Sequence, residues 1–273
     1  MPKAFFPRLF QTQKGLKKAY KGKRVNIIAN FGKIAMVERV KTGIEGLDEL
    51  LQGGIPTSSS FLIPGGAGTG KTIFAMQYIY NGALQYNEPG IYVTLETNLK
   101  NITWNMQSFN WDIKKMQDKN LMRTYRLNLS YSKNYEEIEE KIDNELAVIA
   151  ELVEEIGAKR LAIDSVASFG LWIERRGLLR NLLYRFTDKL KDLGCTTLLT
   201  TETGGERREF SQFGVEEFIV DGVISLYFVP PNRAIFVKKM RGTDHSKNIH
   251  PFEITPRGIS VKSKDRILWE SIK

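Results

Sequence analysis

One eight-residue stretch of this chain has the composition and spacing of a site for phosphate groups. Residues 65–72 read G-G-A-G-T-G-K-T, with glycine at four of the eight positions. Glycines have no Cβ, so the backbone N–H groups of such a loop can approach phosphate oxygens closely. Lys71 would contact the β and γ phosphates, and the Thr72 hydroxyl would complete the coordination of a Mg²⁺ ion held on them. The pattern predicts a loop that binds a nucleoside triphosphate, with ATP as the expected ligand.

The residues on either side of this loop predict the elements that must position it. Residues 60–63 are mostly apolar and predict a short strand, and the residues after Thr72 continue with helical spacing. Such a helix would present its positive end to the phosphates. The predicted nucleotide contacts are eight consecutive residues: Gly65, Gly66, Ala67, Gly68, Thr69, Gly70, Lys71 and Thr72.

A carboxylate for the metal is expected at the end of another buried strand. Residues 161–164 read L-A-I-D, an apolar strand that ends in an acid and follows the helix-ending Gly157. We therefore predict that Asp164 and Thr72 share the Mg²⁺ ion. The alternative is that Asp164 only caps the segment that follows it, a task that Ser165 could also perform.

Composition narrows the class of protein. The 273 residues are 42% hydrophobic and 26% charged, which is typical of one large globular domain, and no apolar run approaches the length of a membrane span. We expect a cytoplasmic protein that does not contact a membrane. The only cysteine, Cys195, lies in an apolar run, so a disulfide framework is excluded and a buried, unreactive thiol is expected. His245 and His250 do not have the spacing of a zinc site.

The positive charge of the chain is concentrated at its start. Residues 1–35 contain nine cations and no acidic residue, and removing them from the 40 basic residues leaves 31, equal to the 31 acidic ones. The body therefore has no net charge, and its charge does not indicate a nucleic-acid surface. Residues 1–35 are expected to be a basic extension that binds nucleic acid or an anionic membrane, or else to lie upstream of a native start at Met36.

From residue 59 onwards, predicted strands and helices alternate. This order predicts an α/β fold in residues 36–273, with a mostly parallel central sheet, helices on both faces and C-terminal antiparallel strands. The expected strands cover residues 60–63, 90–96, 121–127, 160–164 and 195–201, and the expected helices 98–109, 138–156 and 175–193. Residues 222–228, 234–240 and 252–254 are expected to form the closing antiparallel set.

With these segments in place, residues 37–262 resemble the KaiC-like ATPases of the RecA/RadA superfamily. The resemblance rests on several segments beyond the phosphate loop: residues 42–48 with 53–56, 89–96, 196–202, 213–218, and 241–245 with 251–252. It implies a RecA-like P-loop NTPase fold, ATP and Mg²⁺ as cofactors, and a homo-oligomer, expected to be a hexameric ring.

The resemblance also implies catalytic residues. Glu96 is similar to the family's general base, which orients water on the γ phosphate. KaiC-like members usually have two adjacent glutamates there, whereas here Thr97 follows, as in the recombinases; hydrolysis is therefore a firmer expectation than phosphate transfer to protein. The alternative is that Glu96 only begins the helix near Asn98.

Two cations near the C-terminus resemble residues that act on a neighbouring subunit. Lys239 and Arg241 alternate on a predicted strand and should point to the same side. In the family the matching cations reach the γ phosphate of the next subunit, so the predicted catalytic set is Lys71, Glu96, Lys239 and Arg241. Alternatively, the two cations only protect an exposed edge strand from unwanted pairing.

We therefore expect an ATPase that works as a homo-oligomeric ring in regulation or signalling, with a protein partner that the sequence does not identify. The alternative is a recombinase paralogue that binds single-stranded DNA through aromatic and basic side chains of two loops. These side chains are Phe169, Trp172, Arg175, Arg176, Arg207, Arg208, Phe210 and Phe213. A clock or autokinase function is not carried over, because the chain has one such domain and shows no match to the phosphorylated segment of the clock proteins.

Overall fold

A computed structural model describes residues 37–95, 98–128, 134–171, 173, 175–203 and 211–268. The chain divides into two units, residues 1–37 and 38–273, and the fold described below is that of the second unit. The predicted basic extension at residues 1–35 lies outside the described residues.

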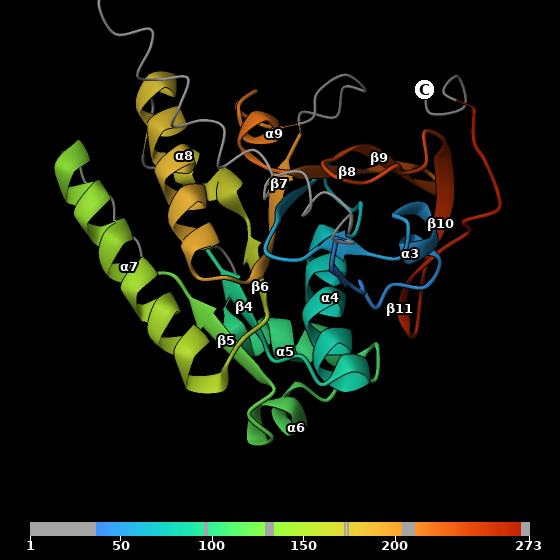
Figure 1. Cartoon of the computed structure of the whole chain (residues 1–273), viewed down its shortest axis with the longest axis horizontal. Helices are drawn as coiled ribbons and strands as arrows, with labels where there is room; N and C mark the ends of the chain where they lie inside the picture. Colours follow the sequence, from blue (N-terminus) through green and yellow to red (C-terminus); the bar gives the residue numbers. More distant parts are fainter. Residues whose placement is uncertain are drawn as a thin grey trace, which may run out of the picture. The chain divides into compact units, whose positions relative to one another are not determined.

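The second unit is built on a nine-stranded sheet in the order β11-β10-β9-β8-β3-β7-β6-β4-β5 (Figure 1). Six neighbouring strands, from β8 to β5, run parallel, while β9, β10 and β11 are antiparallel to their neighbours. The strands are β3 (Ser60–Gly65), β4 (Gly90–Thr94), β5 (Met122–Arg126), β6 (Arg160–Asp164), β7 (Thr196–Glu202), β8 (Gly222–Val229), β9 (Asn232–Met240), β10 (Ile249–Thr255) and β11 (Gly258–Val261). This arrangement confirms the predicted fold class.

The prediction that residues 222–228 belong to the antiparallel set is wrong in one respect. Strand β8 pairs antiparallel with β9, but it pairs parallel with β3 on its other side. The reason is the connection that precedes it, because the chain passes through helix α9 (Glu216–Ile219) between β7 and β8 instead of turning back in a hairpin. A short turn at Pro230 and Pro231 then makes the first antiparallel pair, β8 with β9.

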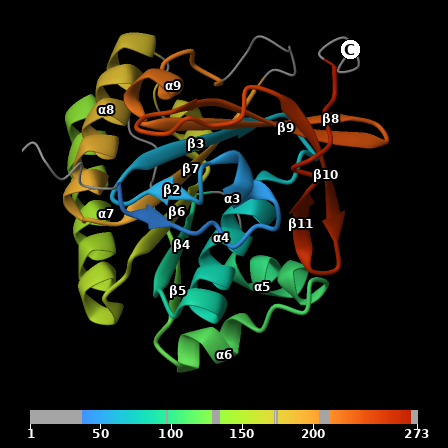
Figure 2. The same cartoon turned by 45° about the vertical axis from the view of Figure 1, so that its right-hand side comes forward.

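Helices cover both faces of the sheet, and Figure 2 shows the two layers from a second angle. One face is covered by α4 (Lys71–Tyr86), with α5 (Leu99–Gln107) and α6 (Ile113–Asp118) beside it; the other by α7 (Tyr135–Ile156) and α8 (Arg176–Asp192). Shorter elements complete the fold: α3 (Leu47–Leu50), η1 (Val166–Leu171), and the pair β1 (Arg39–Val40) and β2 (Ile55–Pro56). No helix within the described ranges has the length and apolar character that crossing a membrane requires.

Local sequence signals account for the boundaries of the longest helix. Asn134 caps α7 by accepting a hydrogen bond from the Glu136 N–H, and Gly157 ends it in the left-handed conformation. The buried side chains of α7 follow the predicted helical spacing: Ile138, Ile142, Leu146, Ile149, Val153 and Ile156. Lys189 of α8 pairs with Asp143 of α7 at 2.6 Å, so the two helices also meet at a charged edge.

Candidate functional site

The glycine-rich loop connects the carboxyl end of β3 to the start of α4, as the sequence predicts. Gly68 and Gly70 have φ angles of 74° and 99°, in the left-handed region that favours glycine. A Cβ at Gly65 would lie 2.6 Å from the Thr69 hydroxyl oxygen and 2.9 Å from the Leu226 carbonyl oxygen. The loop therefore needs glycine at Gly65 for close packing and at the other two positions for backbone conformation.

Lys71 lies over this loop. Its ammonium group donates hydrogen bonds to the carbonyl oxygens of Gly65 and Gly66, at 2.9 and 3.0 Å. Ala67 and Gly68, at the tip of the loop, are exposed. The structure thus places a flexible cation beside an open loop at the positive end of a 16-residue helix, an arrangement suited to binding phosphate.

Thr72 and Asp164 are brought together from distant parts of the chain. The Thr72 hydroxyl, in the first turn of α4, donates a hydrogen bond of 2.8 Å to Oδ2 of Asp164, at the end of β6. A hydroxyl and a carboxylate beside a phosphate loop are oxygen ligands of the kind that Mg²⁺ prefers. The residues present therefore fit a Mg²⁺ ion carried in with a nucleotide.

Two further hydroxyl groups, which the sequence did not predict, contact Asp164. Tyr92 of β4 donates to Oδ2 at 2.6 Å, and Thr200 of β7 donates to Oδ1 at 2.5 Å. The strand register explains the contacts, because Thr94 of β4 pairs with Asp164 and Leu199 of β7 pairs with Ile163. Hydroxyl side chains within the two strands that neighbour β6 were the available signal.

Arg233 and Phe228, which the sequence also did not indicate, contact the phosphate loop at Gly68. The guanidinium group of Arg233 donates to the Gly68 carbonyl oxygen at 3.3 Å and lies 4.2 Å from the centre of the Phe228 ring. Phe228 also lies against Gly68, because a Cβ there would be 3.5 Å from its ring. The β8–β9 hairpin therefore supports the tip of the phosphate loop.

Glu96, the predicted general base, lies outside the described residues, as does Thr97. The strand that precedes it is described and ends beside the predicted metal site, since the Leu95 N–H donates to the Asp164 carbonyl oxygen at 2.9 Å. The role of Glu96 stays a prediction.

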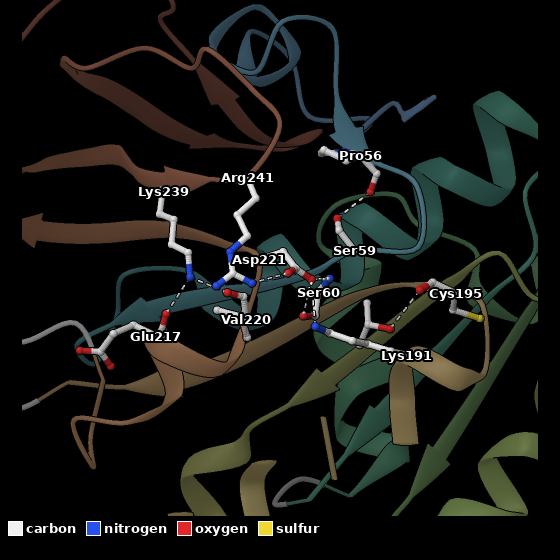
Figure 3. A network of polar contacts seen from close by, with 11 residues as sticks. Pro56, Ser59, Ser60, Lys191, Cys195, Glu217, Val220, Asp221, Lys239 and Arg241 are labelled. Atoms are coloured by element: carbon white, nitrogen blue, oxygen red, sulfur yellow. Dashed lines mark hydrogen bonds and ion pairs between the residues drawn. The ribbon is translucent and has the colours of Figure 1, made fainter. Parts of the chain in front are cut away.

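Lys239 and Arg241 lie elsewhere, at the end of β9, and both reach towards residues 217–221 (Figure 3). The Lys239 ammonium group donates to the carbonyl oxygens of Val220 and Glu217, at 2.6 and 3.2 Å. Burial lowers the pKa of Lys239, and the nearby Arg241 lowers it further. The Arg241 guanidinium donates to Oδ1 of Asp221 at 3.0 Å but keeps 61% of its side chain exposed.

Asp221 joins three elements at this place. Its Oδ2 accepts hydrogen bonds from the Ser60 N–H and hydroxyl, both at 3.1 Å, and lies 3.3 Å from the Lys191 ammonium group (Figure 3). Burial raises the pKa of Asp221, but the Ser60 hydrogen bonds, the charge of Lys191 and the hydrogen bond from Arg241 outweigh it and leave the pKa below its ordinary value. No sequence motif indicated a function for Asp221.

The structure therefore does not bring Lys239 and Arg241 to the phosphate loop of the same chain. Met240 pairs with Gly222 and Phe61 with Gly222, so the two cations lie at the amino end of β3. The loop follows the carboxyl end, five residues further on, and a strand rises about 3.3 Å per residue. About 17 Å of strand thus separates the two places.

The structure contradicts part of the predicted DNA-binding surface. Phe169 is buried, with 1% of its surface exposed, and packs edge-on against Phe186 with 5.0 Å between ring centres. It is a core residue that cannot stack on a base, because its apolar ring has a better environment in the interior. Phe213 also packs against this core, whereas Arg175 and Arg176 are exposed. The other four predicted residues, Trp172, Arg207, Arg208 and Phe210, lie outside the described residues.

The single cysteine and the two histidines occupy structural positions. Cys195 is buried and donates to the Ala158 carbonyl oxygen, and burial raises its pKa to about 11. His250 is buried and is held by Ser246 and by the Asp265 carbonyl oxygen, at 2.8 and 2.7 Å. The Nδ1 atom of His245 lies 2.9 Å from the Ser246 carbonyl oxygen.

Comparison with known proteins gives a consistent result. The ATPase family KaiC matches residues 40–266. A UPF0273 protein of Pyrococcus furiosus is 40% identical over 240 residues, which are 83% of this chain and 94% of the relative. The circadian clock oscillator protein KaiC of Synechococcus elongatus is 35% identical over 231 residues, which are 82% of this chain but 44% of the relative.

A solved structure agrees with these relatives. The crystal structure of a KaiC-like protein from Pyrococcus horikoshii superimposes with a TM-score of 0.73 at 41% sequence identity, covering 82% of this chain and 99% of the other. The phosphate loop, the neighbouring strand that ends in Asp164 and this likeness over most of the chain lead to one conclusion: the chain belongs to the KaiC family of ATPases.

Proposed function

We propose that this protein hydrolyses ATP with Mg²⁺ as a homo-oligomeric ring, in which each site is shared by two subunits. The observation that carries this proposal is the contact between Thr72 and Asp164 beside the glycine-rich loop. It supports a site for a metal-bound triphosphate, and membership of the KaiC family supports hydrolysis as its reaction.

Each predicted residue has a defined role in this proposal. The backbone of residues 65–70 and Lys71 bind the phosphates, and Thr72 and Asp164 hold the Mg²⁺ ion, which neutralises charge on the β and γ phosphates when bound. Glu96 accepts a proton from the attacking water or orients it. Fixed donors and charges act on the transferred phosphate where negative charge develops, which is the main source of rate acceleration in such sites.

The shared site follows from the separation along β3. Lys239 and Arg241 lie about 17 Å from the loop of their own chain, so neither side chain can contact a phosphate bound there. If they stabilise a transferred phosphate, it is one bound by another copy. The exposed Arg241 side chain supports that assignment.

The surface around Arg241 also supports an oligomer. A hollow of about 520 Å³ lies between α8 and α9, with Arg241 in its wall. Two exposed aromatic side chains line it, Tyr184 at 59% and Phe218 at 67%. Aromatic residues combined with arginine are typical of the centre of protein interfaces.

The proposed biological task is regulation or signalling in the cytoplasm, through a protein partner that binds one nucleotide state of the ring. Family membership supports this general class only. The name of a clock protein describes that relative, and a clock role is not proposed for this chain.

Mixing two inactive variants tests the shared site most directly. Lys71→Ala removes the phosphate lysine, and Arg241→Ala removes the cation given to the next subunit. We expect each variant alone to lose turnover while still forming rings, and mixed rings to regain it. Activity should return at sites between unlike subunits. There the Arg241→Ala subunit supplies an intact phosphate loop with Lys71, and the neighbouring Lys71→Ala subunit supplies Arg241.

The control is wild-type protein compared with Glu96→Gln, with oligomer mass and ATP binding measured together. The variant should bind ATP, remain assembled and lose turnover. Mixed rings that stay inactive, with mixing verified by mass, would contradict the shared site. Wild-type rings that bind ATP without turnover, with or without single-stranded DNA, would reduce the proposal to nucleotide binding.

A further inference from the structure

Hydroxyl groups from three separate elements donate to the two oxygens of the Asp164 carboxylate. Thr72 and Tyr92 donate to Oδ2, and Thr200 donates to Oδ1. We propose that Tyr92 and Thr200 are positioning residues that fix this carboxylate and so determine how tightly the site holds its metal ion. The proposal rests on the function proposed above, and it adds two residues to that site which neither the sequence motif nor the family resemblance assigned.

The register of the sheet makes these contacts specific. Thr94 pairs with Asp164. Tyr92 lies two residues before Thr94 on the adjacent strand, so its side chain is on the same face of the sheet as that of Asp164. Two residues of strand span about 6.6 Å, a gap that a tyrosine side chain can bridge and a short hydroxyl residue cannot. The Tyr92 side chain is fully buried, so its ring is fixed by packing and its hydroxyl reaches Asp164 from a rigid support.

Thr200 holds the carboxylate from the opposite side. Leu199 of β7 pairs with Ile163 of β6, so the next residue on β7, Thr200, lies beside Asp164. Thr200 is itself fully buried, and its hydroxyl also lies 3.5 Å from the Ile163 carbonyl oxygen. Asp164 is therefore held by a side chain from each neighbouring strand, and neither of its oxygens is left to rotate freely.

The orientation of Asp164 determines that of Thr72. The Thr72 hydroxyl donates its hydrogen bond to Asp164. The lone pairs of the Thr72 oxygen therefore point away from the carboxylate and can face a metal ion. The donors around Asp164 are neutral hydroxyls, and no ion pair to it forms within the described part of the chain. Among the described residues its negative charge is thus oriented by hydrogen bonds rather than by cations, which suits a divalent cation.

The test measures metal-dependent nucleotide binding without turnover. A fluorescent ATP analogue is titrated into the full chain in EDTA and then at increasing Mg²⁺ concentration. For Tyr92→Phe we expect unchanged affinity in EDTA and a half-saturating Mg²⁺ concentration raised about tenfold or more, as expected when a hydrogen bond to a charged group is lost. Thr200→Val should act in the same direction, and Thr200→Ser should restore the wild-type value.

Tyr78→Phe is the matched control. Tyr78 is fully buried like Tyr92, and its hydroxyl donates at 3.1 Å to the Thr196 carbonyl oxygen, away from the metal site. It should lower the melting temperature without moving the Mg²⁺ titration. The proposal is overturned if Tyr92→Phe shifts the Mg²⁺ titration no more than Tyr78→Phe does, or if it weakens binding equally in EDTA.

Failure of the two proposals can be distinguished. A wild-type protein that binds no ATP in either condition overturns the proposed function and the positioning role with it. A wild-type protein that binds ATP in a Mg²⁺-dependent way, with an unshifted Tyr92→Phe titration, overturns the positioning role alone.

Discussion

Two carboxylates lie at opposite ends of the parallel strands around β3, Asp164 at the carboxyl end of β6 and Asp221 just before β8, and they are held in opposite ways. At the carboxyl end, Asp164 accepts hydrogen bonds from the neutral hydroxyls of Thr72, Tyr92 and Thr200. At the amino end, Asp221 accepts hydrogen bonds from Ser60 and is also paired with the cations Lys191 and Arg241.

The difference shows what each end can do. A carboxylate that already has two cations beside it gains little from a third, so Asp221 serves to join β3, α8 and the end of β9. A carboxylate oriented by hydroxyls keeps its charge available for Mg²⁺. Position in the sheet also matters, because the carboxyl ends of parallel strands are where α/β proteins bind their ligands.

The largest expected effect comes from removing the charge at the carboxyl end. In Asp164→Asn the amide cannot balance Mg²⁺, so we expect turnover to fall by about 100-fold or more, which is at least ~2.7 kcal/mol of transition-state stabilisation. Steady-state hydrolysis at saturating Mg²⁺ measures it. A variant with normal turnover would remove Asp164 from the metal site.

The matching substitution at the amino end of β3, Asp221→Asn, should lower the stability of the fold. Asp221→Asn keeps the shape but removes the charge that Lys191 and Arg241 share. We expect unfolding free energy to fall by about 1–2 kcal/mol, mainly from the weakened Ser60 hydrogen bonds, since both cations are partly exposed and their attraction is screened. Denaturant unfolding measures the loss. ATP affinity of the variant should stay at the wild-type value, and a large loss of that affinity would contradict the division between the two ends.

The pH dependence of stability tests whether Asp221 stabilises the amino end of β3 through its charge. The pKa of Asp221 is lower in the folded chain than the ordinary value of about 3.9 expected when unfolded. Its contribution is therefore complete above about pH 5 and is lost as the pH falls through the lowered folded pKa. Between about pH 5 and pH 2 the wild-type protein should lose more stability than Asp221→Asn. Parallel curves for the two proteins would show that Asp221 does not contribute through its charge.

The glycine-rich loop after β3 and the strand that ends in Asp164 could be predicted because each is encoded by consecutive residues. A glycine loop needs consecutive residues, and the apolar run before Asp164 marks a buried strand. The end of α7 at Gly157 was also predicted, since capping depends on neighbouring residues, whereas its start at Tyr135, after the Asn134 cap, lies three residues before the predicted start at residue 138.

Contacts that depend on strand register could not be predicted. Tyr92 lies 72 residues from Asp164 in sequence and Thr200 lies 36 residues from it, and nothing local states which strands are neighbours. Ser60 and Asp221 are 161 residues apart for the same reason. Phe169 was assigned to a surface loop because aromatic and basic residues surround it in sequence, whereas its own burial is set by packing on α8.

The smallest expected effect uses Cys195 as a reporter of the amino end. This thiol precedes β7 and lies in the core, where burial raises its pKa to about 11, so at neutral pH it is both uncharged and inaccessible. A disulfide reagent should label the native wild-type protein slowly. Asp221→Asn should speed labelling several-fold by easing opening of this end, while Tyr92→Phe, whose lost contact is at the other end, should change the rate less. Labelling that Tyr92→Phe accelerates as strongly as Asp221→Asn would mean that the two ends open together, and the sheet would then have to be treated as one cooperative unit.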